Sequence, residues 1–110
     1  MNIMNADRLA RQFQALGNPL RLRIIRELAE HAMCSSTIRD AKDINAALMP
    51  NVASLADTLK VDQSTLSNHL RVLYDVGLLR HWRIAHGSSY YILDNDALGA
   101  ISKSITPNNG

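Results

Sequence analysis

The sequence predicts a mainly α-helical domain that also carries one β-hairpin, which is an α+β fold. Apolar residues recur at helical spacing along most of the chain, whereas residues 79–93 contain two short runs rich in β-branched and aromatic side chains. A chain of 110 residues with 46% hydrophobic content suffices for one compact core and is too short for two ordinary domains. We therefore expect residues 1–110 to form a single domain.

Two helices are predicted in the first third of the chain. In the first, at about residues 5–16, Leu9, Phe13 and Leu16 share one face, and the Gly-Asn-Pro sequence at 17–19 ends the helix. Pro19 suits the first turn of a second helix, because an N–H at that position has no helical partner. The apolar residues of this second helix form a wide stripe suited to a core: Leu20, Leu22, Ile24, Ile25 and Leu28.

Residues 35–50 predict a further helix. Thr37 is followed by Asp40 three residues later, which is a capping pattern. Ile38, Ala41, Ile44 and Leu48 would then share one face until Pro50 ends the helix.

Residues 53–76 predict a helix-turn-helix. The stretch VASLADTLK forms a short helix, and Asp62 is placed to cap a second helix that begins near Gln63, which we refer to as the reading helix. After Gly77 the runs LLRHWRI and SSYYIL predict a hairpin at about residues 79–93. Asp94 is then placed to cap a last helix at about residues 95–105.

The reading helix carries an unusual polar face. Leu66, Leu70 and Leu73 lie within a narrow arc, and a step of about 100° per residue places short polar side chains on the other side. A solvated helix face usually carries Glu and Lys, but residues 61–74 contain neither. Side chains such as Ser, Asn, Gln and Arg hydrogen-bond base edges in the major groove of DNA. This face therefore predicts DNA recognition.

The hairpin adds a second indication. Its basic side chains are expected on or beside a glycine-bearing tip that could reach phosphates or a minor groove: Arg80, His81, Arg83 and His86. A helix-turn-helix followed directly by a basic hairpin is the order of elements in a winged helix. Taken alone, the hairpin could equally be an ordinary exposed one.

Three strings of the sequence, FQALGNPLRLRIIRELAE at 13–30, SLADTLKVDQSTLSNHLRVLYDVGLL at 54–79 and YYIL at 90–93, resemble the ArsR/SmtB family of winged-helix repressors. The resemblance implies a homodimeric transcriptional repressor that binds an imperfect palindrome in double-stranded DNA.

We expect helices 5–16 and 95–105 to form the dimer interface, because a small core does not bury their apolar stripes completely. The expected DNA-binding residues are Gln63, Ser64, Thr65, Ser67, Asn68, His69, Arg71, Arg80, Arg83 and His86. For His69, packing or hydrogen bonding at the flank of the helix is an equal alternative.

Family members often sense metals, and the positions of their ligands have counterparts in this chain. The resemblance implies thiolates where this chain has Asn51 and Ala53, and an acid and a histidine where it has Asp94 and Asp96. Only Asp94 fits, and we therefore expect neither a metal at these sites nor a cofactor. Cys34 is a possible sensor, although a lone cysteine at a helix end is more often a small hydrophobic residue. A thiol-responsive or redox-responsive repressor, or an unidentified small-molecule effector, remains open.

Several functional classes are disfavoured. The sequence contains no nucleophile elbow, metal cluster or phosphate-binding glycine loop, so we expect no enzyme. A single cysteine excludes an internal disulfide, and no apolar run approaches the ~20 residues that span a bilayer. These features predict a cytoplasmic protein with no membrane partner. A winged-helix module that binds a protein instead of DNA is the alternative, and Arg71, Arg80 and Arg83 argue against it.

Overall fold

The computed structural model describes residues 3–84 and 87–105, and the side chains from Ala6 onward. In that part of the chain the elements are α1 (Ile3–Leu16), α2 (Pro19–Glu30), a 3-10 helix (Ala41–Asp43), α3 (Val52–Leu59), α4 (Gln63–Asp75), β1 (Leu79–Arg83), β2 (Ser89–Leu93) and α5 (Asn95–Ile105). The two strands form an antiparallel hairpin in which Leu79 pairs with Leu93 and Arg83 with Ser89. The predicted winged helix-turn-helix is confirmed.

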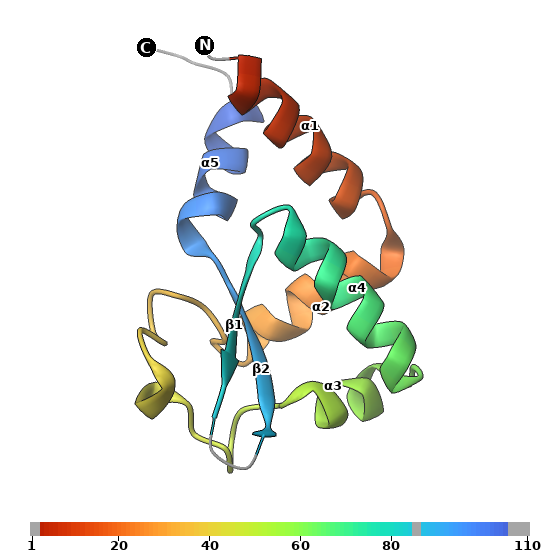
Figure 1. Cartoon of the computed structure of the whole chain (residues 1–110), viewed down its shortest axis with the longest axis vertical. Helices are drawn as coiled ribbons and strands as arrows, with labels where there is room; N and C mark the ends of the chain where they lie inside the picture. Colours follow the sequence, from red (N-terminus) through yellow and green to blue (C-terminus); the bar gives the residue numbers. More distant parts are fainter. Residues whose placement is uncertain (1–2, 85–86, 106–110) are drawn as a thin grey trace.

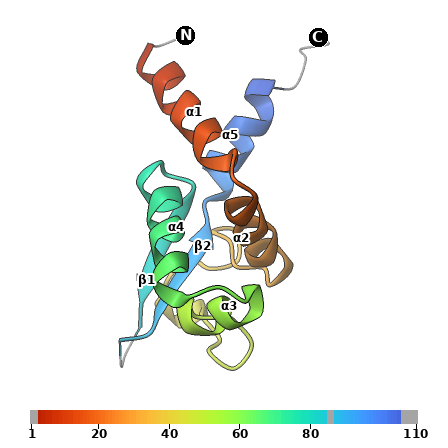
Figure 2. The same cartoon turned by 90° about the vertical axis from the view of Figure 1, so that its right-hand side faces the viewer.

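The molecule is elongated, with extents of 46 × 27 × 22 Å. Helices α1 and α5 lie at one end, whereas α3, the start of α4 and the end of the hairpin where β1 leads into β2 lie at the other end (Figure 1). Seen from the side, α1 and α5 diverge like the arms of a V (Figure 2). Among the described residues, no helix has both the length and the apolar composition needed to cross a membrane.

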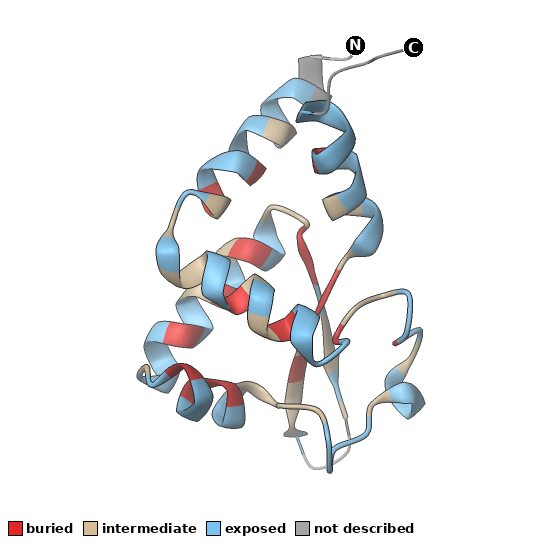
Figure 3. Cartoon of the chain, turned by 180° about the vertical axis from the view of Figure 1, so that it is seen from behind, coloured by how far each residue is buried: buried red, intermediate tan, exposed pale blue. Residues whose placement is uncertain are grey.

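The core lies between α2, α3, α4 and the hairpin. Leu66, Leu70 and Leu73 of the reading helix α4 are fully buried, as their spacing predicts. Figure 3 shows the buried positions of α3 and α4 on their inner faces, while most of α1 and α5 is exposed. The expectation that Leu22 joins the core is wrong, because its side chain is 46% exposed. Leu22 lies two residues before the buried Ile24. At about 100° per residue this places Leu22 about 200° away, on the opposite side of α2.

The turn between α3 and α4 is closed by backbone geometry. Lys60 adopts a left-handed conformation with φ of 57°, and the N–H of Val61 bonds the carbonyl oxygen of Ala56 at 3.1 Å. These contacts satisfy the last carbonyls of α3 before the next helix begins. At the other end of α4, Gly77 has φ of 82°, and the N–H of Leu78 bonds the carbonyl oxygen of Leu73 at 3.0 Å.

The helix expected over residues 35–50 does not form. The segment contains turns and a three-residue 3-10 helix at Ala41–Asp43, and of its apolar positions only Ile38 is fully buried. Its polar side chains bond the nearby backbone instead: Thr37 donates to the carbonyl oxygen of Ala32 at 2.8 Å, and Asn45 accepts from the N–H of Ala47 at 3.1 Å. Such local bonds offer the chain an alternative to the helix.

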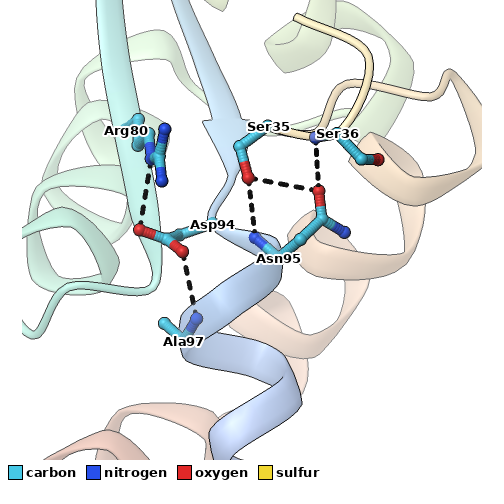
Figure 4. A network of polar contacts seen from close by, with 6 residues as sticks. All are labelled: Ser35, Ser36, Arg80, Asp94, Asn95 and Ala97. Atoms are coloured by element: carbon cyan, nitrogen blue, oxygen red, sulfur yellow. Dashed lines mark hydrogen bonds and ion pairs between the residues drawn. The ribbon is translucent and has the colours of Figure 1, made fainter. Parts of the chain in front are cut away.

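A polar network joins the start of this segment to the hairpin and α5 (Figure 4). Asp94 caps α5, as predicted, by accepting from the N–H of Ala97 at 3.0 Å, and its second oxygen accepts from Nε of Arg80 at 3.2 Å. Asn95 Oδ1 accepts from the N–H of Ser36 at 2.7 Å, and the Asn95 N–H bonds Oγ of Ser35 at 2.9 Å. The base of the hairpin and the first turn of α5 are therefore held together.

Candidate nucleic-acid interface

Helix α4 begins with a tight cap. Asp62 accepts from the N–H of Thr65 at 3.3 Å and from the hydroxyl of Ser64. The Ser64 hydroxyl, followed by the backbone of Thr65, holds the pKa of the Asp62 carboxyl below its usual value. Ser64, which the sequence suggests as a DNA contact, thus uses its hydroxyl hydrogen inside the protein and has only acceptor capacity left.

The outer face of α4 is free to make new hydrogen bonds. Gln63, Ser67, Asn68 and Arg71 are exposed, and within the described part of the chain their side chains have no hydrogen-bond partner. Asn offers both a donor and an acceptor, and Arg offers several donors in a fixed plane. These are the groups that read the donor and acceptor pattern of the major groove.

A polar hollow of about 370 Å³ separates α4 from the hairpin. Gln63 and Ser67 line it from α4, and His81, Arg83 and Tyr91 line it from the two strands. The rest of its lining comes from the start of α3, the turn of the hairpin and the first residue of β2: Asn51, Val52, Ala53, Gly87, Ser88 and Ser89. The polar side chains of helix and hairpin therefore form one continuous surface.

Three aromatic rings join the hairpin to the last turns of α4. His81 stacks on Tyr91 with ring centroids 4.5 Å apart, and Tyr74 meets both rings edge-on at 6.3 Å. Burial, and secondly the charge of Arg83, lowers the pKa of His81 below its usual value, so this ring is neutral at pH 7. His81 therefore contributes packing and a hydrogen-bonding edge rather than the positive charge that the sequence suggests.

The basic residues of the hairpin occupy different places. Arg83 is exposed at the end of β1 next to the turn, as expected. Arg80 is not beside the tip: it pairs with Ile92 near the base of the hairpin, and its guanidinium is engaged by Asp94. The sequence shows the order of these residues but not the pairing register that separates them. His86 lies outside the described residues.

His69 lies on the flank of α4, half-buried, where its Nδ1 accepts a hydrogen bond from Nε of Arg21 at 3.1 Å. This is the flank position that the sequence left as the alternative to DNA contact. The role of Arg21 is one that sequence reasoning missed, because nothing in the pattern of α2 pairs it with a residue 48 positions away.

The positions compared with the family's metal sites have structural partners. Asn51 caps α3 by accepting from the N–H of Ser54 at 2.9 Å, and Asp94 is shared between Arg80 and the cap of α5. Over the described residues there is no group of three or more His, Cys, Asp or Glu side chains that could hold a metal ion.

Cys34 is half-buried in the turn after α2. Its Sγ lies 3.1 Å from Oγ1 of Thr37 and 3.3 Å from Oγ of Ser36. Burial raises the pKa of the Cys34 thiol, but the hydrogen bonds of Ser36 and Thr37 outweigh it and hold the pKa below its usual value.

The fold and this surface define the class: a winged helix-turn-helix protein whose reading helix and hairpin present uncommitted hydrogen-bonding groups. The profile of the bacterial regulatory proteins of the arsR family matches residues 51–81, which include α3 and α4. A transcriptional repressor of Synechocystis sp., described as an SmtB homolog, is 29% identical over 98 residues, which are 89% of this chain and 61% of that protein.

An HTH-type transcriptional regulator of Methanocaldococcus jannaschii is 31% identical over 90 residues, covering 81% of this chain and 82% of the relative. The chain belongs to the ArsR family of transcriptional regulators. Among solved structures, the homodimeric winged helix-turn-helix DNA-binding domain of a possible ArsR-family regulator from Mycobacterium bovis is similar, with a TM-score of 0.64 and 22% identity over 93% of this chain and 79% of that one. At this identity the likeness supports the fold.

Proposed function

We propose that this protein is a homodimeric repressor that binds a palindromic operator in double-stranded DNA. The observation that carries the proposal is the exposed, unpartnered set Gln63, Ser67, Asn68 and Arg71 on α4, beside Arg83 of the hairpin. Helix α4 would enter the major groove with Ser67, Asn68 and Arg71, and Arg83 would contact phosphates or the adjacent minor groove. The polar hollow beside α4 continues this surface from the helix to the hairpin.

The dimer interface is assigned to α1 and α5. Phe13 on α1 is 38% exposed and Ile105 on α5 is 64% exposed, so both helices keep exposed apolar surface. The similar domain from M. bovis is described as homodimeric. A two-fold dimer would place its reading helices about 34 Å apart, which is one turn of DNA.

Repression is inferred from the name of the Synechocystis relative, which is a transcriptional repressor. A regulator that binds DNA needs no catalytic group and would act in the cytoplasm. A small molecule or an oxidant acting at Cys34 would be the effector, since Asn51, Ala53 and Asp96 are not the ligands of the usual metal positions.

Selection of bound sequences from random duplex DNA tests the proposal. We expect a selected sequence with inverted symmetry, and an affinity that falls steeply as salt concentration rises, because phosphate contacts release counterions. Sedimentation should show a dimer at micromolar concentration. A monomer with and without DNA would contradict the assembly, and binding that is insensitive to salt would favour the alternative of a protein-interaction module.

A further inference from the structure

We propose that Arg21 and His69 are positioning residues that set the placement of the reading helix relative to α1, and that His69 does this instead of touching DNA. The proposal rests on the proposed function, because the placement matters only for a dimer that reads two half-sites. Neither side chain belongs to the exposed face of α4: Arg21 comes from α2, and His69 lies on the flank of α4.

Arg21 ties three helices together. Its Nε donates to Nδ1 of His69 on α4 at 3.1 Å, and its Nη1 donates to the carbonyl oxygen of Ala15, in the last turn of α1, at 3.2 Å. The backbone N–H of Arg21 is itself held by the Asn18 cap of α2 at 3.1 Å. The guanidinium is planar and rigid, so its two hydrogen bonds fix a direction as well as a distance.

A second set of contacts holds the C-terminal end of α4. Gln12 of α1 is only 5% exposed, and its Nε2 donates to the carbonyl oxygen of Val76, just after α4, at 2.8 Å. The Arg8 side chain covers Gly77 so closely that a Cβ there would lie 2.4 Å from Nη2 of Arg8. Helix α1 is therefore joined to α4 at two places, the middle of α4 through Arg21 and the C-terminal end of α4 through Gln12 and Arg8. In this way a helix assigned to the dimer interface is joined to the helix assigned to DNA.

The place of His69 on α4 allows this role. With about 100° per residue, His69 lies about 100° from Asn68 and about 160° from Ser67 and Arg71. The hollow beside the hairpin is lined by Gln63 and Ser67, not by His69. The ring can therefore hold Arg21 while the outer face of α4 is turned toward a ligand.

The hydrogen bond requires an acceptor on His69. Arginine only donates, so Nδ1 of His69 must offer its lone pair to Nε of Arg21. A side chain without an acceptor at this position cannot make the bond.

A dimer discriminates operators by the separation and angle of its two reading helices. If the Arg21–His69 bond is lost, α1 holds α4 mainly at the C-terminal end of α4. The two reading helices of the dimer are then less precisely placed relative to each other. Operator affinity and the preference for one half-site spacing should then fall. Binding to scrambled DNA should change little, since phosphate contacts tolerate small errors of orientation.

The test compares His69→Leu, which removes the acceptor, with His69→Asn, which keeps an acceptor near the place of Nδ1. His31→Leu is the matched control, because His31 is exposed and its ring bonds Glu27 of α2. Each protein is measured on the selected operator, on operators with one base pair added or removed between half-sites, and on scrambled duplex.

We expect His69→Leu to lose roughly 10-fold to 100-fold in operator affinity, and to distinguish the altered spacings less well. His69→Asn should stay close to wild type in both respects, because its side-chain oxygen can accept from Arg21. His31→Leu should behave like wild type.

Equal operator affinity of wild type and His69→Leu would overturn the inference. So would a His69→Asn protein whose preference among bases changes, because that result indicates direct contact with DNA. Should His69→Leu fail to fold by circular dichroism, Arg21→Met, which removes the donors and keeps the aliphatic stem, is measured in its place, and operator affinity and spacing preference equal to wild type would overturn the inference. A wild type that binds no duplex would refute the proposed function itself, whereas the inference alone fails when wild type binds and the variants bind equally well.

Discussion

The segment 35–50 and the reading helix 63–75 begin with similar patterns and end as different structures. Both carry apolar residues at helical spacing after a capping residue, Thr37 in the one and Asp62 in the other. One forms a helix of 13 residues, and the other forms turns around a 3-10 helix of three. In α4 every apolar position of the inner face meets the core, whereas Leu48 in the other segment is 74% exposed.

The difference teaches that helical spacing is a condition for a helix and not a cause. A short helix is marginal by itself and depends on burying its apolar face. Leu66, Leu70 and Leu73 have α2 and the hairpin to pack against, so α4 forms. Residues 35–50 lack such a surface. Their hydroxyl and amide side chains therefore bond the nearby backbone, and no α-helix forms there.

The largest expected effect tests this dependence on burial. Leu70→Ala should lower the free energy of unfolding by about 2 to 5 kcal/mol, because the side chain is fully buried and leaves a cavity. Leu48→Ala should change it by less than about 0.5 kcal/mol. Urea denaturation of both variants is the measurement. Similar losses in the two would show that residues 35–50 are also held by burial.

The outer faces should differ in function. Asn68→Ala should cost about 1 to 3 kcal/mol of binding free energy on the operator and little on random DNA, because a base group is left unsatisfied only in the preferred sequence. Asn45→Ala is the control from the other segment, and its DNA affinity should equal wild type. If Asn68→Ala weakened both duplexes equally, α4 would not enter the groove as proposed.

A smaller effect is expected at the hairpin. Arg83→Ala should weaken all DNA sequences alike and reduce the slope of log affinity against log salt by roughly one unit, since one phosphate contact is lost. Arg39→Ala removes an exposed arginine from the other segment and should leave the slope unchanged. Titrations at several salt concentrations measure both. A sequence-dependent loss for Arg83→Ala would place this side chain on base edges instead.

The turns that precede the two segments allow a matched comparison of backbone strain. Ala32 and Lys60 have φ of 54° and 57°, a conformation that costs an L-residue free energy and glycine little. Ala32→Gly and Lys60→Gly should each raise stability by about 0.5 to 1 kcal/mol, after the extra freedom of glycine in the unfolded chain is subtracted. Thermal unfolding checks this, and a loss in either variant would mean that the side chain packs favourably.

The smallest expected effect is at Cys34. Under reducing conditions Cys34→Ser should leave DNA affinity unchanged, because the thiol lies in the turn before residues 35–50 and far along the chain from α4. Gel-shift titrations with and without peroxide are the measurement. Release of wild type but not of the variant by peroxide would identify Cys34 as a sensor and give the segment 35–50 a regulatory part.

Much of the candidate site follows from local pattern. The spacing of three leucines places Ser67, Asn68 and Arg71 on the exposed face of α4, and they are exposed. The partners of Arg80 and His69 could not be predicted in this way, because they come from residues 14 and 48 positions away. Such pairings depend on strand register and on the angle between helices, which no local spacing contains.

The sequence by itself determined the order and approximate bounds of α1, α2, α3, α4, the hairpin and α5, since capping residues, prolines, glycines and apolar spacing act within a few residues. It also determined that α4 carries a polar face without Glu or Lys. Only the tertiary structure decided that residues 35–50 form no α-helix and that Arg80 pairs with Asp94. It also decided that Arg21 holds His69. The physical reason is that burial and polar pairing depend on which surfaces meet, and those surfaces are distant in the sequence.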